Sequence, residues 1–423
     1  MEAQNSVIPR DTYLNQLIDG MHNHMIKIVT GIRRSGKSFL LSKLFVEHLH
    51  TTGVDDEHII NIALDEFEFR ALRAPENIYD YINERIKDQQ MYYLLIDEVQ
   101  MLTDFVDILN SLLHKDNIDV YVTGSNSKFL SKDVATEFRG RGDEIHIYPL
   151  SFSEYYNAIR GEKAERWLEY QRYGGLPQLL FLSGDKKKTD FLKQINETVY
   201  IKDLIERCNI KNVDEFQELL MIISSNIGAP CNPTKLSNTF KSVKGISIDP
   251  KTISNYLSYM EDAFLIEKAM RYDIKGKKYI GNLSKYYFQD IGLRNAVIDF
   301  RQMEESHIME NVIYNELRNR GYRVDVGFVE VWATSNDKRQ RKQLEVDFVA
   351  EQGHNRYYIQ SALEMSTPDK KEQEKASLKN IDDGFKRIII VRSDMAPYYD
   401  ENGYLVMGLY DFLLKPNIFV EQN

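Results

Sequence analysis

The sequence predicts an α/β protein that begins with a parallel sheet covered by helices on both faces. Up to about Leu150, short apolar runs alternate with amphipathic helical patterns, and this alternation is typical of βαβ units. Hydrophobic residues make up 43% of the chain and charged residues 28%, a balance that suits a packed core and excludes a largely disordered chain. The expected strands are 25–30, 59–64, 92–97, 119–123 and 144–148, and the helical patterns between them include 37–49 and 105–113.

The size and charge of the chain limit its class. Its 423 residues correspond to roughly two to four domains. The formal net charge of -10 excludes a generally basic polyanion-binding protein but leaves room for a local basic patch. Two cysteines, Cys208 and Cys231, provide no disulfide framework, and no segment has the apolar character of a secretory signal or a membrane span. We therefore expect a soluble, cytoplasmic protein with no membrane partner.

The remainder of the chain is expected to form three further parts. Residues 151–225 are mostly helical in pattern. Residues 226–300 contain a helix, a turn, a second helix that Asp249 can cap, and a short strand pair. Residues 301–423 have the pattern of a helix, a strand, a charged loop at 335–343, two strands, a helix and a strand.

The segment Gly31–Ser38 fits the phosphate-binding motif G-x-x-x-x-G-K-[ST] at every fixed position, between an apolar strand and a helix. Its glycines allow backbone N–H groups to point at phosphate oxygens, and the helix N-terminus adds partial positive charge. Lys37 is expected to reach the β- and γ-phosphates, and Ser38 to bind Mg²⁺. A chance match in a turn is the alternative. The expected nucleotide-binding residues are Gly31, Arg33, Arg34, Ser35, Gly36, Lys37, Ser38 and Phe39.

Two carboxylates follow the apolar strand Tyr92–Asp97. Asp97 is expected at the carboxyl end of this strand, beside the phosphate-binding loop, where it can hold the hydration shell of Mg²⁺. Glu98 can orient or deprotonate the attacking water. The alternative is an ordinary strand that ends in an acidic turn. An acidic pair at this place favours hydrolysis over simple nucleotide storage.

Two further polar segments are candidates for contact with the γ-phosphate. One strand ends in Gly124-Ser125-Asn126, and Asn126 or Ser125 can sense the phosphate there, although these residues are also typical of turns. An arginine before the last strand, Arg139 or Arg141, can act as an arginine finger across a subunit boundary, which requires at least a homodimer. The alternative for this arginine is a solvated basic turn.

Together these features resemble the AAA+ ATPases of the additional-strand P-loop class. The resemblance is close to a bacterial and archaeal branch that joins an AAA ATPase to a C-terminal region of unknown function. It lies in GIRRSGKS, YYLLIDEVQ, YVTGSNSKFL, FRGRGDEIHIYPLSFSEYY and YGGLPQLL, and later in NETVYIKDL, the helix-turn-helix and ENVIYNEL…LEVDFVA…YYIQSA.

The resemblance implies a P-loop AAA+ core with a five-stranded parallel sheet at 1–150, a helical lid at 151–225, a winged helix at 226–300 and a restriction-endonuclease-like domain at 301–423. It also implies that Lys37, Ser38 and Asp97 are phosphate and Mg²⁺ ligands. The catalytic residues that it implies are Glu98 as the base, Asn126 as the sensor and Arg141, which matches the family's Gly-Arg position better than Arg139. By analogy, adenine lies near Ile8–Arg10, and Arg172 is a candidate second sensor.

The winged-helix region carries cations that could contact duplex DNA. The alternative is a structural or protein-binding winged helix, which the acidic net charge favours. A protein partner is therefore a further hypothesis. The cations concerned are Lys235, Lys241, Lys244, Lys251, Arg271, Lys275, Lys277 and Lys278.

The C-terminal part resembles the PD-(D/E)xK nuclease fold, with Glu310 and Asp347 at two acidic positions of that motif. The strand that should supply an acid and a lysine has Gln360 and Ala362 instead, while the nearby acids Glu345 and Glu364 have the wrong spacing. An inactive nuclease scaffold is therefore expected.

The function predicted from the sequence is a Mg²⁺-dependent ATPase whose small-molecule partners are ATP and ADP. One alternative is a nucleotide-dependent switch or DNA-binding regulator with negligible turnover. An active DNA nuclease is the third and least favoured hypothesis.

Overall fold

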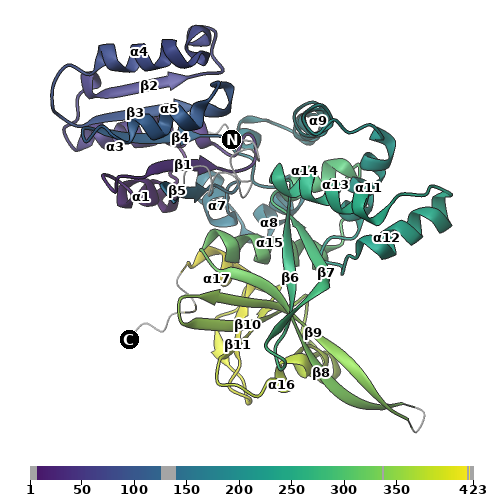
Figure 1. Cartoon of the computed structure of the whole chain (residues 1–423). Coiled ribbons are helices and arrows are strands. Elements are labelled where there is room, and N and C mark those ends of the chain that lie inside the picture. The colour runs from purple at the N-terminus through teal and green to yellow at the C-terminus, as the bar shows by residue number, and fades with distance from the viewer. Residues whose placement is uncertain (1–6, 125–139, 336–337, 417–418, 420–423) are drawn as a thin grey trace. The chain divides into compact units, whose positions relative to one another are not determined.

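The apolar runs at the start of the chain form one sheet of five parallel strands (Figure 1). The computed structural model describes residues 7–124, 140–335, 338–416 and 419. Its strands are in the order β2-β3-β4-β1-β5, so that β4 lies between β1 and β3. Their bounds are β1 Ile26–Thr30, β2 Ile59–Ala63, β3 Tyr92–Asp97, β4 Ile118–Thr123 and β5 Gly142–His146.

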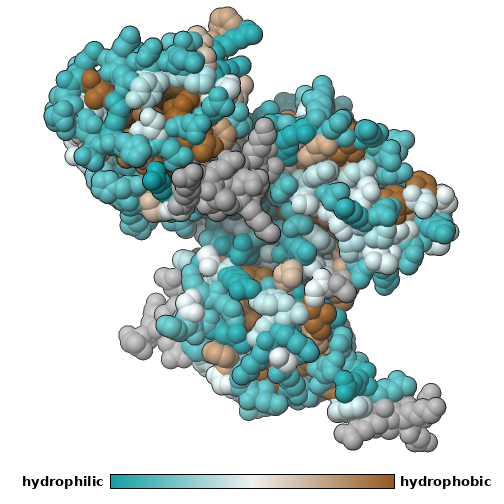
Figure 2. Space-filling view, viewed as in Figure 1, coloured by the Kyte–Doolittle hydropathy of each residue, from teal (hydrophilic) through white to brown (hydrophobic). Residues whose placement is uncertain are grey.

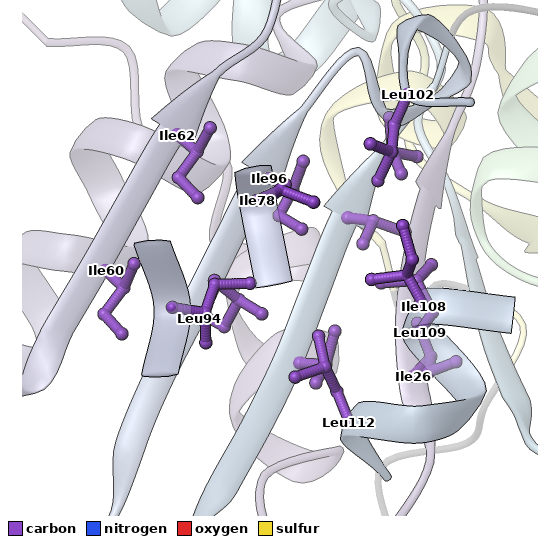
Figure 3. Packing of buried hydrophobic residues seen from close by; sticks show 14 of the residues in the cluster. Ile26, Ile60, Ile62, Ile78, Leu94, Ile96, Leu102, Ile108, Leu109 and Leu112 are labelled. Carbon is purple, nitrogen blue, oxygen red and sulfur yellow. The ribbon is translucent and has the colours of Figure 1, made fainter. Parts of the chain in front are cut away.

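Both faces of this sheet are covered by helices, as the alternating pattern predicts. One face packs Ile28, Ile62 and Leu94 against apolar side chains of α4 (Pro75–Arg85) and α5 (Phe105–Leu112), as Figure 3 shows in part. The other face packs against α1 (Asp11–Asp19) and the helix that follows the phosphate-binding motif. That helix is continuous from Lys37 to Thr51 and comprises α2 (Lys37–Phe39), a π-helical stretch (Leu40–Phe45) and α3 (Val46–Thr51).

The chain divides into two units, Met1–Pro149 with Asp262–Phe264, and Leu150–Glu261 with Leu265–Asn423. The second unit begins with helices, and a continuous helical run extends from Asp185 to Arg207. The helices of its first half are α7 Phe152–Ile159, α8 Lys163–Tyr173, α9 Asp185–Ile195, α10 Lys202–Arg207, α11 Val213–Ser225, α12 Pro233–Thr239 and α13 Pro250–Asp262.

An eight-stranded mixed sheet forms the rest of the second unit, in the order β12-β13-β11-β10-β9-β8-β6-β7. Its strands are β6 Ile266–Asp273, β7 Lys278–Phe288, β8 Arg323–Ser335, β9 Lys338–Gln352, β10 Asn355–Ala362, β11 Lys386–Val391, β12 Tyr398–Tyr399 and β13 Leu405–Gly408. The helices of this half are α14 Ile291–Val297, α15 Glu305–Asn319, α16 Pro368–Lys379 and α17 Leu409–Leu414.

Two features of this sheet differ from the sequence-based expectation. The charged segment at 335–343, expected as a loop, belongs almost entirely to β8 and β9, which pair with each other as far as Ser335 and Lys338. The strand pair β6–β7 is also longer than expected, and β6 joins β8 in parallel. The two strands therefore belong to the same sheet as the C-terminal strands. The division of residues 151–423 into lid, winged helix and nuclease-like domain stays a prediction.

Within the described ranges, no helix has the length and apolar character needed to cross a membrane. Cys208 and Cys231 are both free thiols.

Candidate nucleotide-binding site

The loop between β1 and α2 curls tightly because three of its residues adopt positive φ. Gly31 has φ +138°, Arg34 +64° and Gly36 +98°. A Cβ at Gly31 would lie 2.2 Å from the carbonyl oxygen of Ile147, so no other residue fits there without displacing the backbone. The glycine spacing of the motif therefore follows from this close approach and from the backbone turn.

Lys37 lies inside this curl. Its Nζ donates to the carbonyl oxygens of Gly31, at 2.9 Å, and Ile32, at 3.0 Å, and the side chain is buried. Burial lowers the pKa of Lys37 to about 8, although the carboxylates of Glu98 and Asp97 oppose the shift. A phosphate group at the loop would favour the charged ammonium in the same way as these carboxylates.

A second group in the loop fits an anionic ligand. The side chain of Ser35 is fully buried, and its hydroxyl has no hydrogen-bond partner among the described residues. A buried hydroxyl without a partner costs free energy, which a phosphate oxygen could recover. Ser38 and Phe39 are exposed at the start of the helix, where the hydroxyl of Ser38 is accessible to a metal ion.

The two carboxylates lie beside this loop because β3 and β4 end at the same edge of the sheet as β1. Thr123, the last residue of β4, is fully buried. Its hydroxyl donates to Asp97 Oδ1 and accepts from the backbone N–H of Glu98 at 3.0 Å. Glu98 has φ +52°, and its carboxylate accepts from Gln100 Nε2. One hydroxyl thus holds the carboxylate of Asp97 and the backbone of Glu98, a role that the sequence did not reveal.

Arg10 is a second residue whose role was missed. Its guanidinium donates to Ser35 O at 3.0 Å and to Tyr148 O at 2.6 Å, and it lies 4.7 Å from the centre of the Tyr13 ring. The side chain is buried and joins the phosphate-binding loop to the end of the sheet. The family resemblance implied only that Arg10 lies near adenine, which stays a prediction.

The structure does not describe all of the remaining predicted residues. Ser125, Asn126 and Arg139 lie outside the described residues. Arg141 is exposed, and its carbonyl accepts from the N–H of Ile26 at 2.9 Å, at the amino end of β1. The loop follows the carboxyl end of β1, so Arg141 is at the opposite edge of the sheet. Its predicted role as a finger therefore requires a second chain.

The predicted winged-helix surface has exposed cations. Asn232 caps α12 with hydrogen bonds to the N–H groups of Thr234 and Lys235, and Asp249 accepts from Lys251 N at 2.7 Å beside Pro250, the first residue of α13. Other exposed lysines of this region include Lys241, Lys275, Lys277 and Lys278.

The acidic residues of the nuclease-like region surround an internal lysine. Lys285 Nζ contacts Glu310 at 2.9 Å and Glu345 at 2.7 Å, and both it and Asp347 are buried. Burial and the nearby Glu310 raise the pKa of Asp347 well above its usual range. The described residues contain no group of three or more metal-ligand side chains arranged to hold a metal ion.

The neighbouring strand, β10, carries the two residues that depart from the nuclease motif. Ala362, at the position where the nuclease motif has lysine, is buried in an apolar cluster with Tyr358 and Leu378. Gln360 accepts a long hydrogen bond, 3.4 Å, from the hydroxyl of Ser377. Nuclease activity or its absence stays a prediction.

Comparison with known proteins gives matches along the chain. Residues 23–156 match an AAA domain, residues 164–304 a domain of unknown function (DUF8612), and residues 305–412 another (DUF4143). An uncharacterized protein of Haemophilus influenzae is 33% identical and aligns with 97% of this chain and 99% of its own length. An uncharacterized protein of Methanocaldococcus jannaschii is 30% identical and aligns with 85% of this chain and 79% of its own length. A solved Walker-type ATPase of Pyrococcus abyssi is 15% identical, with a TM-score of 0.49 over 70% of this chain and 98% of its own.

Proposed function

Because the chain belongs to the family of AAA+ ATPases with an N-terminal AAA domain and a C-terminal DUF4143 region, we propose that it binds ATP with Mg²⁺ and hydrolyses it. The observation that carries this proposal is the buried Lys37 ammonium within the curled loop, beside Asp97 and Glu98. Loop amides and a lysine at this place suit a triphosphate better than a neutral ligand.

Each residue has a distinct part in the proposed reaction. Lys37 holds the β- and γ-phosphates, and Ser35 donates to a phosphate oxygen. Ser38 and Asp97 would hold Mg²⁺, which would neutralise charge that develops on the phosphates. Glu98 accepts a proton from the attacking water. Thr123 keeps Asp97 and the backbone of Glu98 in place.

The substitution Glu98→Gln tests hydrolysis separately from binding. The amide keeps the size of the side chain but cannot take a proton, so ATP should bind with nearly unchanged affinity while turnover falls by about 100-fold or more. The matched control is Glu84→Gln, at an exposed position of α4. Equal turnover in Glu98→Gln and the control would remove Glu98 from its role.

The same assay distinguishes the alternative of a nucleotide-dependent switch. A switch would retain ATP with a turnover far below ~1 s⁻¹, the lower end of ordinary enzymes, in the unsubstituted chain. DNA contact through the winged-helix cations is a further proposal, supported by the exposure of Lys235, Lys241 and Lys251. A cytoplasmic location, a homo-oligomer and a protein partner also stay predictions.

A further inference from the structure

The strands β8 and β9 continue past their neighbours as a two-stranded arm, defined here as residues 329–335 and 338–344 (Figure 1). On one side β6 pairs with β8 only up to Phe328, and on the other β10 pairs with β9 only from Phe348 onward. The register of the arm runs from Val329 with Leu344 to Ser335 with Lys338. Seven residues of antiparallel strand correspond to a projection of about 24 Å.

The second strand of the arm is strongly basic. It begins Lys338-Arg339-Gln340-Arg341-Lys342, with four cations in five residues, although the whole protein has a net charge of -10. Arg341 and Lys342 are exposed. Because successive residues of a strand point to opposite faces, these two cations serve both faces of the ribbon. The part of the arm that is coloured in Figure 2 is largely hydrophilic.

An exposed aromatic ring lies among these charges. Trp332 pairs with Arg341 across the arm and is 55% exposed, and the Arg341 guanidinium lies 5.2 Å from the centre of its ring. Glu330 holds the same guanidinium at 3.6 Å. Charged residues alone would be explained as protection of a free ribbon against aggregation. That explanation does not account for a large exposed tryptophan, which is typical of a contact surface.

A second basic segment lies at the base of the arm. The parallel pairing of β6 with β8 brings the β6–β7 turn beside Phe328, whose carbonyl accepts from Ile274 N at 3.1 Å. Lys277 and Lys278 in and after this turn are exposed, while Lys275 lies 3.6 Å from Asp382. Two basic segments that are far apart in the sequence therefore lie at the same end of neighbouring strands in one sheet.

We propose that the arm, with the β6–β7 turn at its base, binds duplex DNA. A two-stranded ribbon fits the B-form major groove, which is about 12 Å wide, whereas the major groove of duplex RNA is too narrow for it. The cations along the ribbon neutralise phosphates, and Trp332 and Arg341 can contact groove walls or base edges. This activity goes beyond ATP hydrolysis and does not depend on it.

Fluorescence anisotropy with a labelled DNA duplex of about 24 base pairs, without nucleotide, tests the proposal. The double variant Arg341→Gln/Lys342→Gln should weaken binding about tenfold or more at 50 mM salt. It should also lower the slope of log affinity against log salt by about 1.8, because each lost phosphate contact removes about 0.9. The matched control, Lys186→Gln/Lys187→Gln, removes the same charge from exposed positions of α9 and should stay within about twofold of the unsubstituted protein.

Trp332 provides a readout that reports the arm itself. The chain has two tryptophans, and Trp167 is fully buried, so acrylamide quenches mainly Trp332. Duplex DNA should shield Trp332 from quenching in the unsubstituted protein and in the α9 control. The proposal is overturned by absence of binding at 50 mM salt, by unshielded Trp332 in the complex, by equal loss in both double variants, or by equal affinity for duplex RNA. It is also overturned if an acidic protein such as a polyglutamate chain shields Trp332 as strongly as DNA does.

Discussion

The hydroxyl of Thr123 hydrogen-bonds both the carboxylate of Asp97 and the backbone N–H of Glu98. Replacement by valine keeps the shape and removes both hydrogen bonds, so the buried Asp97 and the N–H of Glu98 lose their partner. An unpartnered buried group costs about 1–3 kcal/mol, and we expect kcat for ATP to fall by roughly 10- to 100-fold. ATP affinity should change much less, because the two hydrogen bonds of the Thr123 hydroxyl go to Asp97 and Glu98 and not to Lys37.

The conservative variant Thr123→Ser is the control, since it keeps the hydroxyl and should restore most of the turnover. Steady-state ATPase assays and equilibrium binding of ATP separate the two effects. Thr123→Val with unchanged kcat, or Thr123→Ser as impaired as valine, would rule out the positioning role.

Asp290 should make stability depend on pH. It is buried, it accepts from Gly175 N at 2.8 Å and Leu293 N at 2.9 Å, and burial raises its pKa to about 6. The unfolded carboxyl has a pKa of about 4, so the folded state binds the proton more tightly. The contribution of Asp290 to the free energy of unfolding is therefore greatest below pH 4 and falls by roughly 3 kcal/mol as the pH rises through 6.

Urea unfolding between pH 4 and 8 measures this dependence. Asp290→Asn loses one hydrogen-bond acceptor and should be less stable than the unsubstituted protein at low pH. The difference between their free energies of unfolding should move in favour of the variant by roughly 3 kcal/mol as the pH rises to neutral. Asp382→Asn, at an exposed position, should leave the slope unchanged. Parallel curves for the unsubstituted protein and Asp290→Asn would contradict the prediction.

Single residues also show where the sequence is informative about the site and where it is not. Lys37, Asp97 and Glu98 could be predicted because a local motif and a strand end place them. Thr123 resembles any threonine at a strand end, and its role depends on the neighbouring strand β3. Arg10 contacts Tyr148, which is 138 positions away, and no local pattern records that contact.

At the scale of elements, the junction of β1 with its loop depends on Gly31. Gly31→Ala introduces both the strain of positive φ and a contact with Ile147 O. Gly53→Ala is the matched control, because its φ is +92° and its added Cβ meets nothing within 4 Å. We expect about 1–2 kcal/mol of destabilisation for the control and a further 1–3 kcal/mol or so for Gly31→Ala, measured by urea unfolding. Equal losses would show that the carbonyl contact is unimportant.

The elements themselves were predicted unevenly. The strands of the first sheet were predicted within two residues of their observed bounds, because buried parallel strands are continuous apolar runs. The charged segment at 335–343 was predicted as a loop because an exposed two-stranded ribbon has no buried face and its basic residues show no alternation. The pairing of β6 with β8 joins segments about 50 residues apart, which periodicity within either segment cannot reveal.

At the scale of the whole molecule, the position of Arg141 predicts complementation between two inactive variants. Lys37→Ala has a defective loop and an intact Arg141, whereas Arg141→Ala has the reverse. If the arginine acts in trans, an equal mixture should recover about a quarter of the unsubstituted turnover. Half of the chains keep Lys37, and half of those have a neighbouring chain that supplies Arg141. Turnover no higher than the mean of the two variants alone would exclude this role.

The most direct measurement is calorimetric titration of the full chain with ATP and Mg²⁺, followed by phosphate release. The unsubstituted protein should bind about one ATP per chain and release phosphate, and Lys37→Ala should do neither while unfolding at a similar urea concentration. A folded, unsubstituted chain that neither binds nor hydrolyses ATP would contradict the assignment of the curled loop as a nucleotide site.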